Sequence, residues 1–263
     1  MDILSQIIEY KRDYLKNQKA KVCVATLEEL IVLQKPKASF KKAIVKMPYS
    51  LIAEFKRKSP SKGIINITSS LQDTLIGYEK AGASAVSILT DDGFFGGSLQ
   101  DLEIGSTVLN IPILRKEFII DPYQILEARA FGASAILLIA RILDPELFKD
   151  LANFAKILDL DVLVEIHNLN ELKKIDLSFV DVLGVNNRNL SNFKTGIQVS
   201  IDIAQDLPKN ILKISESGIY NAQDANTLLG LGYNGFLIGE QFMRTDNPAK
   251  QCENFINSLN NPI

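Results

Sequence analysis

An acid and a base stand two residues apart at the end of an apolar run in the first quarter of the chain. Residues 51–55 are apolar except for Glu54, Lys56 follows directly, and residues 57–63 form a loop rich in basic, Ser, Pro and Gly residues. Side chains two apart on a strand point to the same face, so Glu54 and Lys56 are expected to share one wall of a pocket. The alternative is an ion pair on the surface, where such pairs contribute little to stability.

Polar residues also follow six later apolar runs, at positions 90–92, 115–117, 165, 186–188, 215–218 and 239–240. Among them, Lys116 and Glu165 are of types that donate and accept protons, and each such group contributes roughly a hundred- to ten-thousand-fold in rate. We expect these two side chains to face one another as general acid and general base. Some of the remaining charges are expected only to pair with one another, among Asp91, Asp92, Arg115 and Glu117.

The last two runs end in small residues that suit a phosphate group. Ser217 with Gly218, and Gly239 with Glu240, offer backbone N–H groups there, and a helix start would add partial positive charge. In barrels of alternating strands and helices, phosphate often binds at these two loops. A phosphorylated small molecule is therefore the expected substrate.

Aromatic residues follow two other runs near the same expected mouth. Phe95 stands in the sequence FFGGS at 94–98, and Phe118 comes two residues after Lys116. Their faces would suit a flat ring. For Phe94, packing within a loop or helix is an equally good interpretation.

The elements that position these residues repeat along the chain. Gly82-Ala83-Ser84-Ala85 and Gly132-Ala133-Ser134-Ala135 each precede an apolar run, and Gly132 lies 50 residues after Gly82 by subtraction. Gly232 precedes a third such run, a further 100 residues on by subtraction. Each glycine suits the left-handed position that ends a helix.

Eight short apolar runs result, about 25 residues apart, at 51–55, 86–89, 112–115, 136–139, 162–166, 182–185, 211–214 and 236–239. That interval fits a strand, a loop and a helix, as in 121–131, where Asp121 caps and Pro122 opens the first turn. Continuous apolar strands alternating with helices indicate a parallel sheet, and eight such units close into a (β/α)8 TIM barrel. An open, doubly wound sheet is the alternative.

The chain is expected to form one barrel domain over residues 1–263, of which 1–47 are an N-terminal helical extension. The extension carries helical patterns over 3–19 and 26–34 and a basic stretch over 35–46. It could plug the N-terminal end of the barrel or lean over the mouth that holds the polar residues.

Composition excludes several functional classes. With 29 basic and 31 acidic residues and a pI near 5.6, the chain has no global field that favours nucleic acid or a membrane surface. No apolar run approaches the roughly 20 residues of a membrane span. Cys23 and Cys252 form no CxxC motif, and His167 has no cluster of metal ligands around it in the sequence, so we expect a cytoplasmic protein without a metal.

Taken together, these motifs resemble those of the indole-3-glycerol phosphate synthase family. The stretch IAEFKRKSPSKG at 52–63 is similar to the signature of that family. The resemblance extends from the N-terminal helices through further motifs at 89–98, 114–119, 164–165, 185–190, 215–219 and 236–240. Two departures are Asn189, where many members carry Asp, and Glu240, where a smaller residue is often found.

The resemblance implies a carboxy-lyase of tryptophan biosynthesis that needs no cofactor. Its substrate would be 1-(2-carboxyphenylamino)-1-deoxyribulose 5-phosphate, which becomes indole-3-glycerol phosphate with loss of carbon dioxide and water. It also implies roles for particular residues: catalytic for Lys116, Glu165, Lys56, Glu54 and Asn186, and substrate-binding for Ser59, Phe95, Phe118, Arg188, Glu216, Ser217, Gly218, Gly239 and Glu240. For its own association we expect a monomer or a weak homo-oligomer.

Two other functional classes fit the same barrel. A sugar-phosphate isomerase would keep the phosphate site, but such enzymes usually run on paired carboxylates or an Asp/Cys pair rather than on a lysine. A non-catalytic module that binds a phosphorylated ligand would make Lys116 and Glu165 dispensable.

Overall fold

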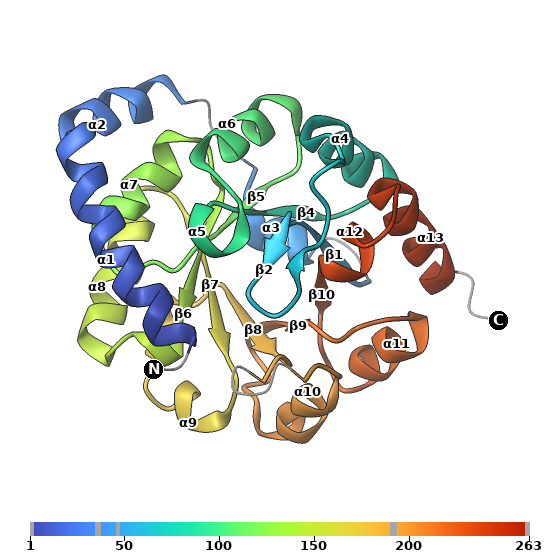
Figure 1. Ribbon diagram of the computed structural model, residues 1–263. Coiled ribbons are helices and arrows are strands. Elements are labelled where there is room, and N and C mark those ends of the chain that lie inside the picture. The colour runs from blue at the N-terminus through green and yellow to red at the C-terminus, as the bar shows by residue number, and fades with distance from the viewer. Residues whose placement is uncertain (1–2, 35–37, 46–47, 190–193, 261–263) are drawn as a thin grey trace.

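Eight parallel strands close into a barrel in the computed structural model, which describes residues 3–34, 38–45, 48–189 and 194–260 (Figure 1). The (β/α)8 barrel predicted from the spacing of apolar runs is confirmed. Its strands are β1 (Ser50–Phe55), β4 (Ala85–Leu89), β5 (Ile113–Lys116), β6 (Ala135–Ile139), β7 (Asp161–Ile166), β8 (Val182–Asn186), β9 (Leu212–Glu216) and β10 (Gly235–Ile238). Strand β1 pairs with both β4 and β10, which closes the ring.

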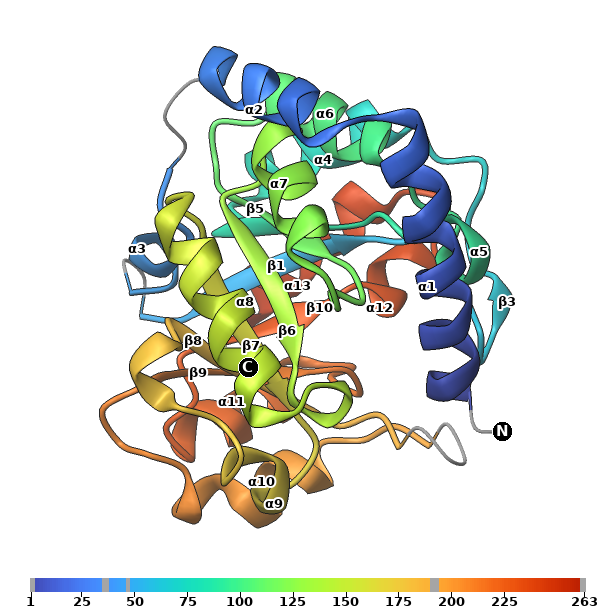
Figure 2. The same cartoon turned by 90° about the vertical axis from the view of Figure 1, so that its left-hand side faces the viewer.

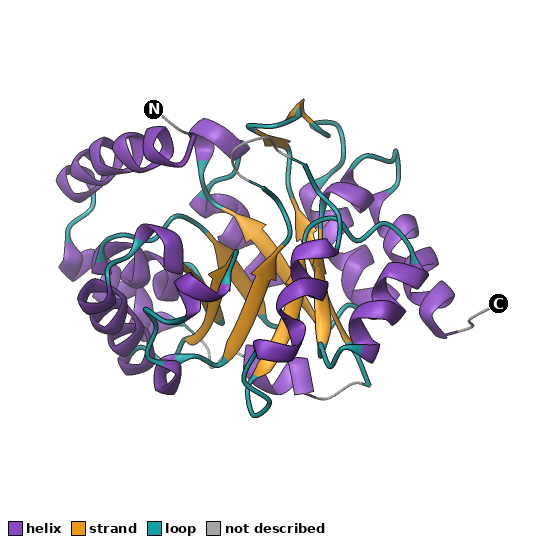
Figure 3. Ribbon diagram, turned by 90° about the horizontal axis from the view of Figure 1, so that it is seen from below, coloured by secondary structure: helices purple, strands orange, loops and turns teal. Residues whose placement is uncertain are grey.

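Helices surround these strands on their outer face (Figures 1 and 3). The longer ones are α4 (Leu71–Ala81), α6 (Leu99–Val108), α7 (Pro122–Ala130), α8 (Pro145–Ile157), α10 (Gln198–Ile203), α11 (Ala222–Gly230) and α13 (Pro248–Asn260). Short turns of helix are α5 (Asp92–Phe95), α9 (Leu169–Leu172), α12 (Glu240–Met243), η1 (Ala140–Ile142), η2 (Leu177–Phe179) and η3 (Ala204–Asp206). The loop after β1 adds a small antiparallel pair, β2 (Lys58–Ser59) with β3 (Gly63–Ile64).

The local signals in the sequence match the helix ends. Asp121 and Gln124 form a capping box at the start of α7, with Pro122 in its first turn. The three repeat glycines adopt left-handed backbone conformations, with φ of 98° at Gly82, 86° at Gly132 and 86° at Gly232. Each helix of the repeat therefore ends where the sequence indicates, and the next strand starts shortly after.

The N-terminal extension has two separate roles, because its helices lie at opposite ends of the barrel (Figure 2). Helix α3 (Phe40–Val45) buries Phe40 and Ile44 among residues of the barrel interior such as Ile52 and Leu114. Ser39 and the backbone N–H of Lys41 both donate to Asp161 at the start of β7. This helix therefore fits the first of the two alternatives for the extension, a plug of the N-terminal end.

The basic stretch at 35–46 thus contains a helix that the sequence pattern did not indicate. Phe40 and Ile44 are four residues apart and share one helical face, while Lys42 lies exposed on the other side. The extension also includes residues 1–2, 35–37 and 46–47, which lie outside the described residues, as do 190–193 near the motif at 185–190.

Helices α1 (Ile3–Lys21) and α2 (Val24–Leu33) lie at the other end and flank of the barrel. Leu15 and Leu27 pack with Tyr123 and Leu126 of α7 in a separate apolar cluster. The first turns of α1 reach over the carboxyl ends of the strands, near α5 and the β2–β3 pair (Figure 2). The extension therefore also leans over the mouth. In the part of the chain that the structure describes, no helix is long and apolar enough to cross a membrane.

Candidate active site

A cavity opens at the carboxyl ends of the barrel strands, and every residue predicted to belong to the site lines it. These residues are Glu54, Lys56, Ser59, Phe95, Lys116, Phe118, Glu165, Asn186, Arg188, Glu216, Ser217, Gly218, Gly239 and Glu240. They come from seven of the eight strand ends, so the fold gathers positions spread over most of the chain into one place. The residues described contain no group of three or more His, Cys, Asp or Glu side chains that could hold a metal ion.

The charged centre of the cavity is one layer of the barrel interior. In such barrels, each layer takes four side chains from alternate strands. Here β1, β5, β7 and β9 supply the layer, with Glu54, Lys116, Glu165 and Glu216. Two residues earlier, the same four strands supply a buried apolar layer of Ile52, Leu114, Leu163 and Ile214. Because side chains two apart share a face, the apolar layer fixes the direction of the charged one.

Lys116 lies between two carboxylates in this layer. Its Nζ is 3.3 Å from Glu165 Oε2 and 2.5 Å from Glu216 Oε2. Its side chain is 13 % exposed, whereas that of Glu216 is 1 % exposed, so the lysine is the more accessible of the two. The predicted pair of Lys116 and Glu165 is thus in direct contact, with Glu216 as a third member.

These contacts set the protonation of the three groups. Burial acts to lower the pKa of Lys116, but the carboxylates of Glu216, Glu165 and Glu54 outweigh it and raise that pKa above the ordinary value. Burial raises the pKa of Glu216 to about 7 even though Lys116 opposes the shift. For Glu165, burial acts upward, but Lys116 and His167 lower the pKa below its ordinary value. At neutral pH the layer therefore holds a charged lysine, an ionised Glu165 and a Glu216 that is partly protonated.

Glu54 and Lys56 form the second ion pair of the cavity, with 2.7 Å between Lys56 Nζ and Glu54 Oε1. Their side chains are 5 % and 11 % exposed, so the alternative of an ion pair on the surface is wrong. Burial acts to raise the pKa of Glu54, yet Lys56 and then Lys116 lower it. The pair borders the layer of Lys116 and forms one wall of the mouth, as the spacing of two predicts.

The loops after β9 and β10 form one end of the cavity. Ser217 and Gly218 both have left-handed backbones, with φ of 65° and 72°. A Cβ at Gly218 would lie 2.5 Å from the backbone nitrogen of Gly196, so the turn leaves no room for a larger residue. Gly239 occupies the cap position of α12, which directs the start of that short helix at the cavity. These are the positions at which the sequence predicts a phosphate group.

A network of two arginines and one carboxylate borders the same end. Arg188 donates to Glu240 Oε2 at 2.7 Å and to Ser61 Oγ at 3.0 Å. The other oxygen of Glu240 lies 2.7 Å from Arg244 Nη2. The carboxylate of Glu240, one of the two departures from the motifs that the sequence resembles, is thus paired with two guanidinium groups. This network was not evident from the sequence, because its members are 52 and 56 residues from Arg188 by subtraction.

The opposite end of the cavity is apolar. The rings of Phe95 and Phe118 lie 5.9 Å apart, and both line the cavity with Ile3, Leu4 and Ile7 of α1. Phe94 instead packs edge-on against Tyr10, with 5.6 Å between the ring centroids. The packing interpretation therefore holds for Phe94, and a flat ring would meet Phe95 and Phe118.

Several charges at the strand ends pair with other protein groups outside the cavity, as the sequence indicates. Arg115 is buried outside the cavity, where it donates to Thr90 Oγ1 at 3.0 Å and to Glu127 Oε2 at 3.0 Å. Asp92 accepts from the hydroxyl of Tyr10 at 2.7 Å. His167 lies behind Glu165, with Nε2 3.8 Å from Glu165 Oε1 and Nδ1 3.4 Å from Glu171 Oε2.

Lys11 is a functional candidate that the sequence analysis did not identify. Lys11 is fully buried between Asp91 and Glu117 next to the cavity. A signal for it exists, because Leu4, Ile7, Lys11 and Leu15 follow one another at helical spacing and all are buried. A lysine in the apolar stripe of a helix indicates a buried acidic partner.

Comparisons with known proteins find one family, both by a family model and by individual relatives. The family model described as Indole-3-glycerol phosphate synthase matches residues 4–255. Relatives of that name are 43 % identical in Bacteroides thetaiotaomicron, over 98 % of this chain and 99 % of the relative, and 39 % identical in Burkholderia ambifaria, over 95 % and 97 %. A tryptophan synthase alpha-subunit from Pyrococcus furiosus has a TM-score of 0.61 at 13 % identity, over 80 % of this chain and 97 % of that one, which supports the fold alone.

Proposed function

The chain belongs to the indole-3-glycerol phosphate synthase family, and from that premise we propose how the residues of its barrel mouth carry out the reaction. The activity is that of a carboxy-lyase of tryptophan biosynthesis, which closes a pyrrole ring on a carboxyphenylamino sugar phosphate and releases carbon dioxide and water. The observation that carries the assignment of roles is the position of Lys116 between Glu165 and Glu216, in a cavity that also has Phe95, Phe118 and the glycine-containing loops after β9 and β10 in its lining.

The substrate spans the cavity from end to end. Its phosphate binds the backbone N–H groups of Ser217, Gly218, Gly239 and Glu240, where the start of α12 adds partial positive charge. Its aromatic ring stacks by Phe95 and Phe118, whose rings already lie 5.9 Å apart. This orientation brings the sugar carbonyl beside the charged layer in the middle.

Lys116 acts as the general acid of ring closure. As the ring carbon attacks the carbonyl carbon, negative charge develops on the carbonyl oxygen, and the ammonium group of Lys116 donates a proton to it. The neighbouring carboxylates keep this lysine protonated at neutral pH by raising its pKa. Loss of the carboxylate as carbon dioxide then restores the aromatic ring, with the electron pair of the broken bond returning to the ring carbon.

Glu165 acts as the general base of the dehydration that follows. The new hydroxyl group leaves as hydroxide while a neighbouring carbon of the five-membered ring loses a proton to Glu165. That proton then joins the hydroxide to form water. Its lowered pKa keeps it ionised and ready at neutral pH. Lys116 and Glu165 are in contact, so the acid and the base reach the same small region of the substrate.

The remaining polar groups bind and orient the substrate. Lys56, held by Glu54, contacts an anionic part of it, and Ser59 lies on the same loop. Asn186, Arg188 and Glu216 orient the hydroxyl groups of the sugar chain and the carboxylate that is lost. All of them line the same cavity, within reach of one extended ligand.

The cellular setting is part of the same proposal. We place the enzyme in the cytoplasm, since Cys23 and Cys252 are both free. We expect it to work as a monomer or a weak homo-oligomer on a phosphorylated small molecule, without nucleic acid.

The direct test is turnover of the carboxyphenylamino sugar phosphate by the purified chain. We expect fluorescence of the indole product to appear together with one equivalent of carbon dioxide per molecule consumed. No product from the pure wild-type protein would contradict the function. Isomerisation of a sugar phosphate in its place would favour the isomerase alternative.

A further inference from the structure

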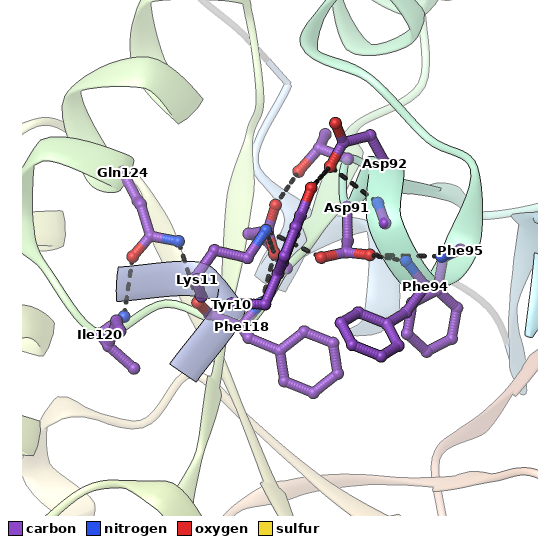
Figure 4. Close-up of polar contacts among 12 residues, drawn as sticks. Tyr10, Lys11, Asp91, Asp92, Phe94, Phe95, Phe118, Ile120 and Gln124 are labelled. Carbon is purple, nitrogen blue, oxygen red and sulfur yellow. Dashed lines mark hydrogen bonds and ion pairs between the residues drawn. The ribbon is translucent and has the colours of Figure 1, made fainter. Parts of the chain in front are cut away.

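Lys11 of α1 is buried completely beside the cavity, where it meets two carboxylates (Figure 4). Its Nζ lies 2.9 Å from Asp91 Oδ2 and 3.0 Å from Glu117 Oε1. It also lies 4.7 Å from the centre of the Tyr14 ring. A lysine taken out of water needs such partners, and removing one partner of a buried pair leaves an uncompensated charge. The contact therefore fixes α1 to two loops of the barrel mouth.

The same two carboxylates also hold the backbone of the aromatic end. The second oxygen of Asp91, Oδ1, accepts from the N–H of Phe94 at 2.6 Å and of Phe95 at 3.2 Å. Oε1 of Glu117 accepts from the N–H of Phe118 at 2.8 Å. Figure 4 shows Lys11, Asp91 and the three phenylalanines gathered beside α5. Each carboxylate thus binds Lys11 and, at the same time, the backbone at a cavity phenylalanine.

Lys11 also fixes the part of α1 that reaches the cavity. Leu4 and Ile7 lie seven and four residues before it on the same buried stripe, and both line the cavity. The apolar end therefore has three walls, from α1, from the loop after β4 and from the loop after β5. Lys11 belongs to the first wall and contacts the carboxylates that anchor the other two, Asp91 and Glu117.

We propose that Lys11 is a positioning residue for the aromatic ring of the substrate, joining α1 to the loops of Phe95 and Phe118 through Asp91 and Glu117. The inference rests on the proposed binding of that ring between Phe95 and Phe118. Lys11 itself does not line the cavity.

The proposal predicts a particular kinetic signature. Lys116 and Glu165 are held by their strands and by one another, far less by α1, so their geometry should survive the loss of Lys11. The ring contacts are made in the bound substrate and persist through the reaction, and losing such uniform binding raises KM with kcat unchanged. Phosphate binds at the other end of the cavity and should not sense the change.

The test compares kcat, KM and competitive inhibition by inorganic phosphate across a set of variants. For Lys11→Met, we expect KM to rise about tenfold or more with kcat within about threefold of wild type, and the inhibition constant for phosphate to stay the same. Lys11→Arg keeps the charge and should recover most of the loss. Lys16→Met changes an exposed lysine of the same helix and is the matched control.

Two further variants separate positioning from stability. Phe40→Ala weakens the fold at the opposite end of the barrel, and its KM should stay at the wild-type value. If Lys11→Met does not fold, the variant K11M/D91N/E117Q removes the unpaired charges, and its KM should still be raised because position 11 no longer joins α1 to both loops.

A wild-type KM in the folded variants that lack Lys11 would overturn the proposal. So would a KM that rises as much in Phe40→Ala, or a phosphate inhibition constant that weakens in step with KM. Failure of the proposed function would look different, because the wild-type protein itself would then give no indole product.

Discussion

Lys116 Nζ lies 2.5 Å from Glu216 Oε2, the shortest of the contacts that the lysine makes with carboxylates in the cavity. The pair joins β5 to β9 across the barrel interior, so two strands distant in sequence set the charge of the proposed acid. Glu216 raises the pKa of Lys116. Burial in turn raises the pKa of Glu216 to about 7.

Replacing Glu216 by Gln should therefore change the pH dependence of the reaction. With one carboxylate fewer beside it, Lys116 has a lower pKa, and the alkaline limb of the kcat profile should move to lower pH. The measurement is kcat between pH 6 and pH 10 for the variant and for Glu253→Gln, which changes an exposed carboxylate on α13. An alkaline limb in Glu216→Gln that coincides with that of the control would contradict this role.

A methyl group at Gly184 should displace Glu216 and so disturb its ion pair with Lys116. A Cβ there would collide with the carboxylate of Glu216, whose Cδ would be 3.2 Å away. Glu216 is buried on all sides, so it must tilt and take Lys116 with it. Gly184→Ala should lose about tenfold or more in kcat with a small change in KM.

The control is Gly230→Ala at the end of α11, where an added Cβ meets nothing within 4 Å. Alanine is the better helix former there, so stability should be equal or slightly higher. A wild-type kcat in Gly184→Ala would show that Glu216 can make room for the methyl group without moving Lys116, and it would contradict this prediction.

His167 should make stability depend on pH. Burial acts to lower its pKa, but Glu171 and Glu165 outweigh it and raise the pKa above the ordinary value of 6.5. A raised pKa in the folded state stabilises the protein below the unfolded pKa, and this contribution is lost as pH rises through the folded value. The free energy of unfolding of His167→Gln should thus fall further below wild type at pH 6 than at pH 9, as measured by urea denaturation.

The comparison with wild type at each pH matters, because Glu216 also has a raised pKa and contributes in the same direction. That contribution is present in both proteins and cancels. A gap between His167→Gln and wild type that widens with rising pH would contradict the assignment.

Phe40→Ala tests the plug formed by α3. Phe40 is fully buried in the barrel interior, and truncating such a phenylalanine costs about 3–5 kcal/mol. The free energy of unfolding should fall by that amount with kcat largely unchanged, since the reacting groups lie at the opposite end. A Phe40→Ala variant with wild-type stability and a strongly reduced kcat would contradict this role of α3.

The barrel and most of the cavity could be predicted from the sequence, because both depend on spacings between residues that are close together in the chain. Ile52 and Glu54 are two apart, as are Leu163 and Glu165, so each strand specifies an apolar layer and the polar group above it. Once eight such strands are recognised, barrel closure brings their ends together without any further information.

The contacts that sequence reasoning could not supply join distant elements. The pairing of Lys11 with Asp91 and Glu117 depends on how α1 crosses the mouth, and no local pattern encodes that crossing. The same holds for the link between Arg188 and Glu240, which lie on different loops. Helix α3 was hidden because Lys41 and Lys42 dominate a segment whose packing depends only on Phe40 and Ile44.

The most direct test of the account is the rate of ring closure in Lys116→Ala, measured with product binding in the same preparation. General-acid catalysis contributes roughly a hundred- to ten-thousand-fold, so kcat should fall by at least about a hundredfold while the indole product binds nearly as in wild type. Lys62→Ala, at an exposed lysine of the loop after β1, is the control and should keep its rate. Turnover near the wild-type rate in Lys116→Ala would contradict the account, as would a loss of product binding with kcat retained.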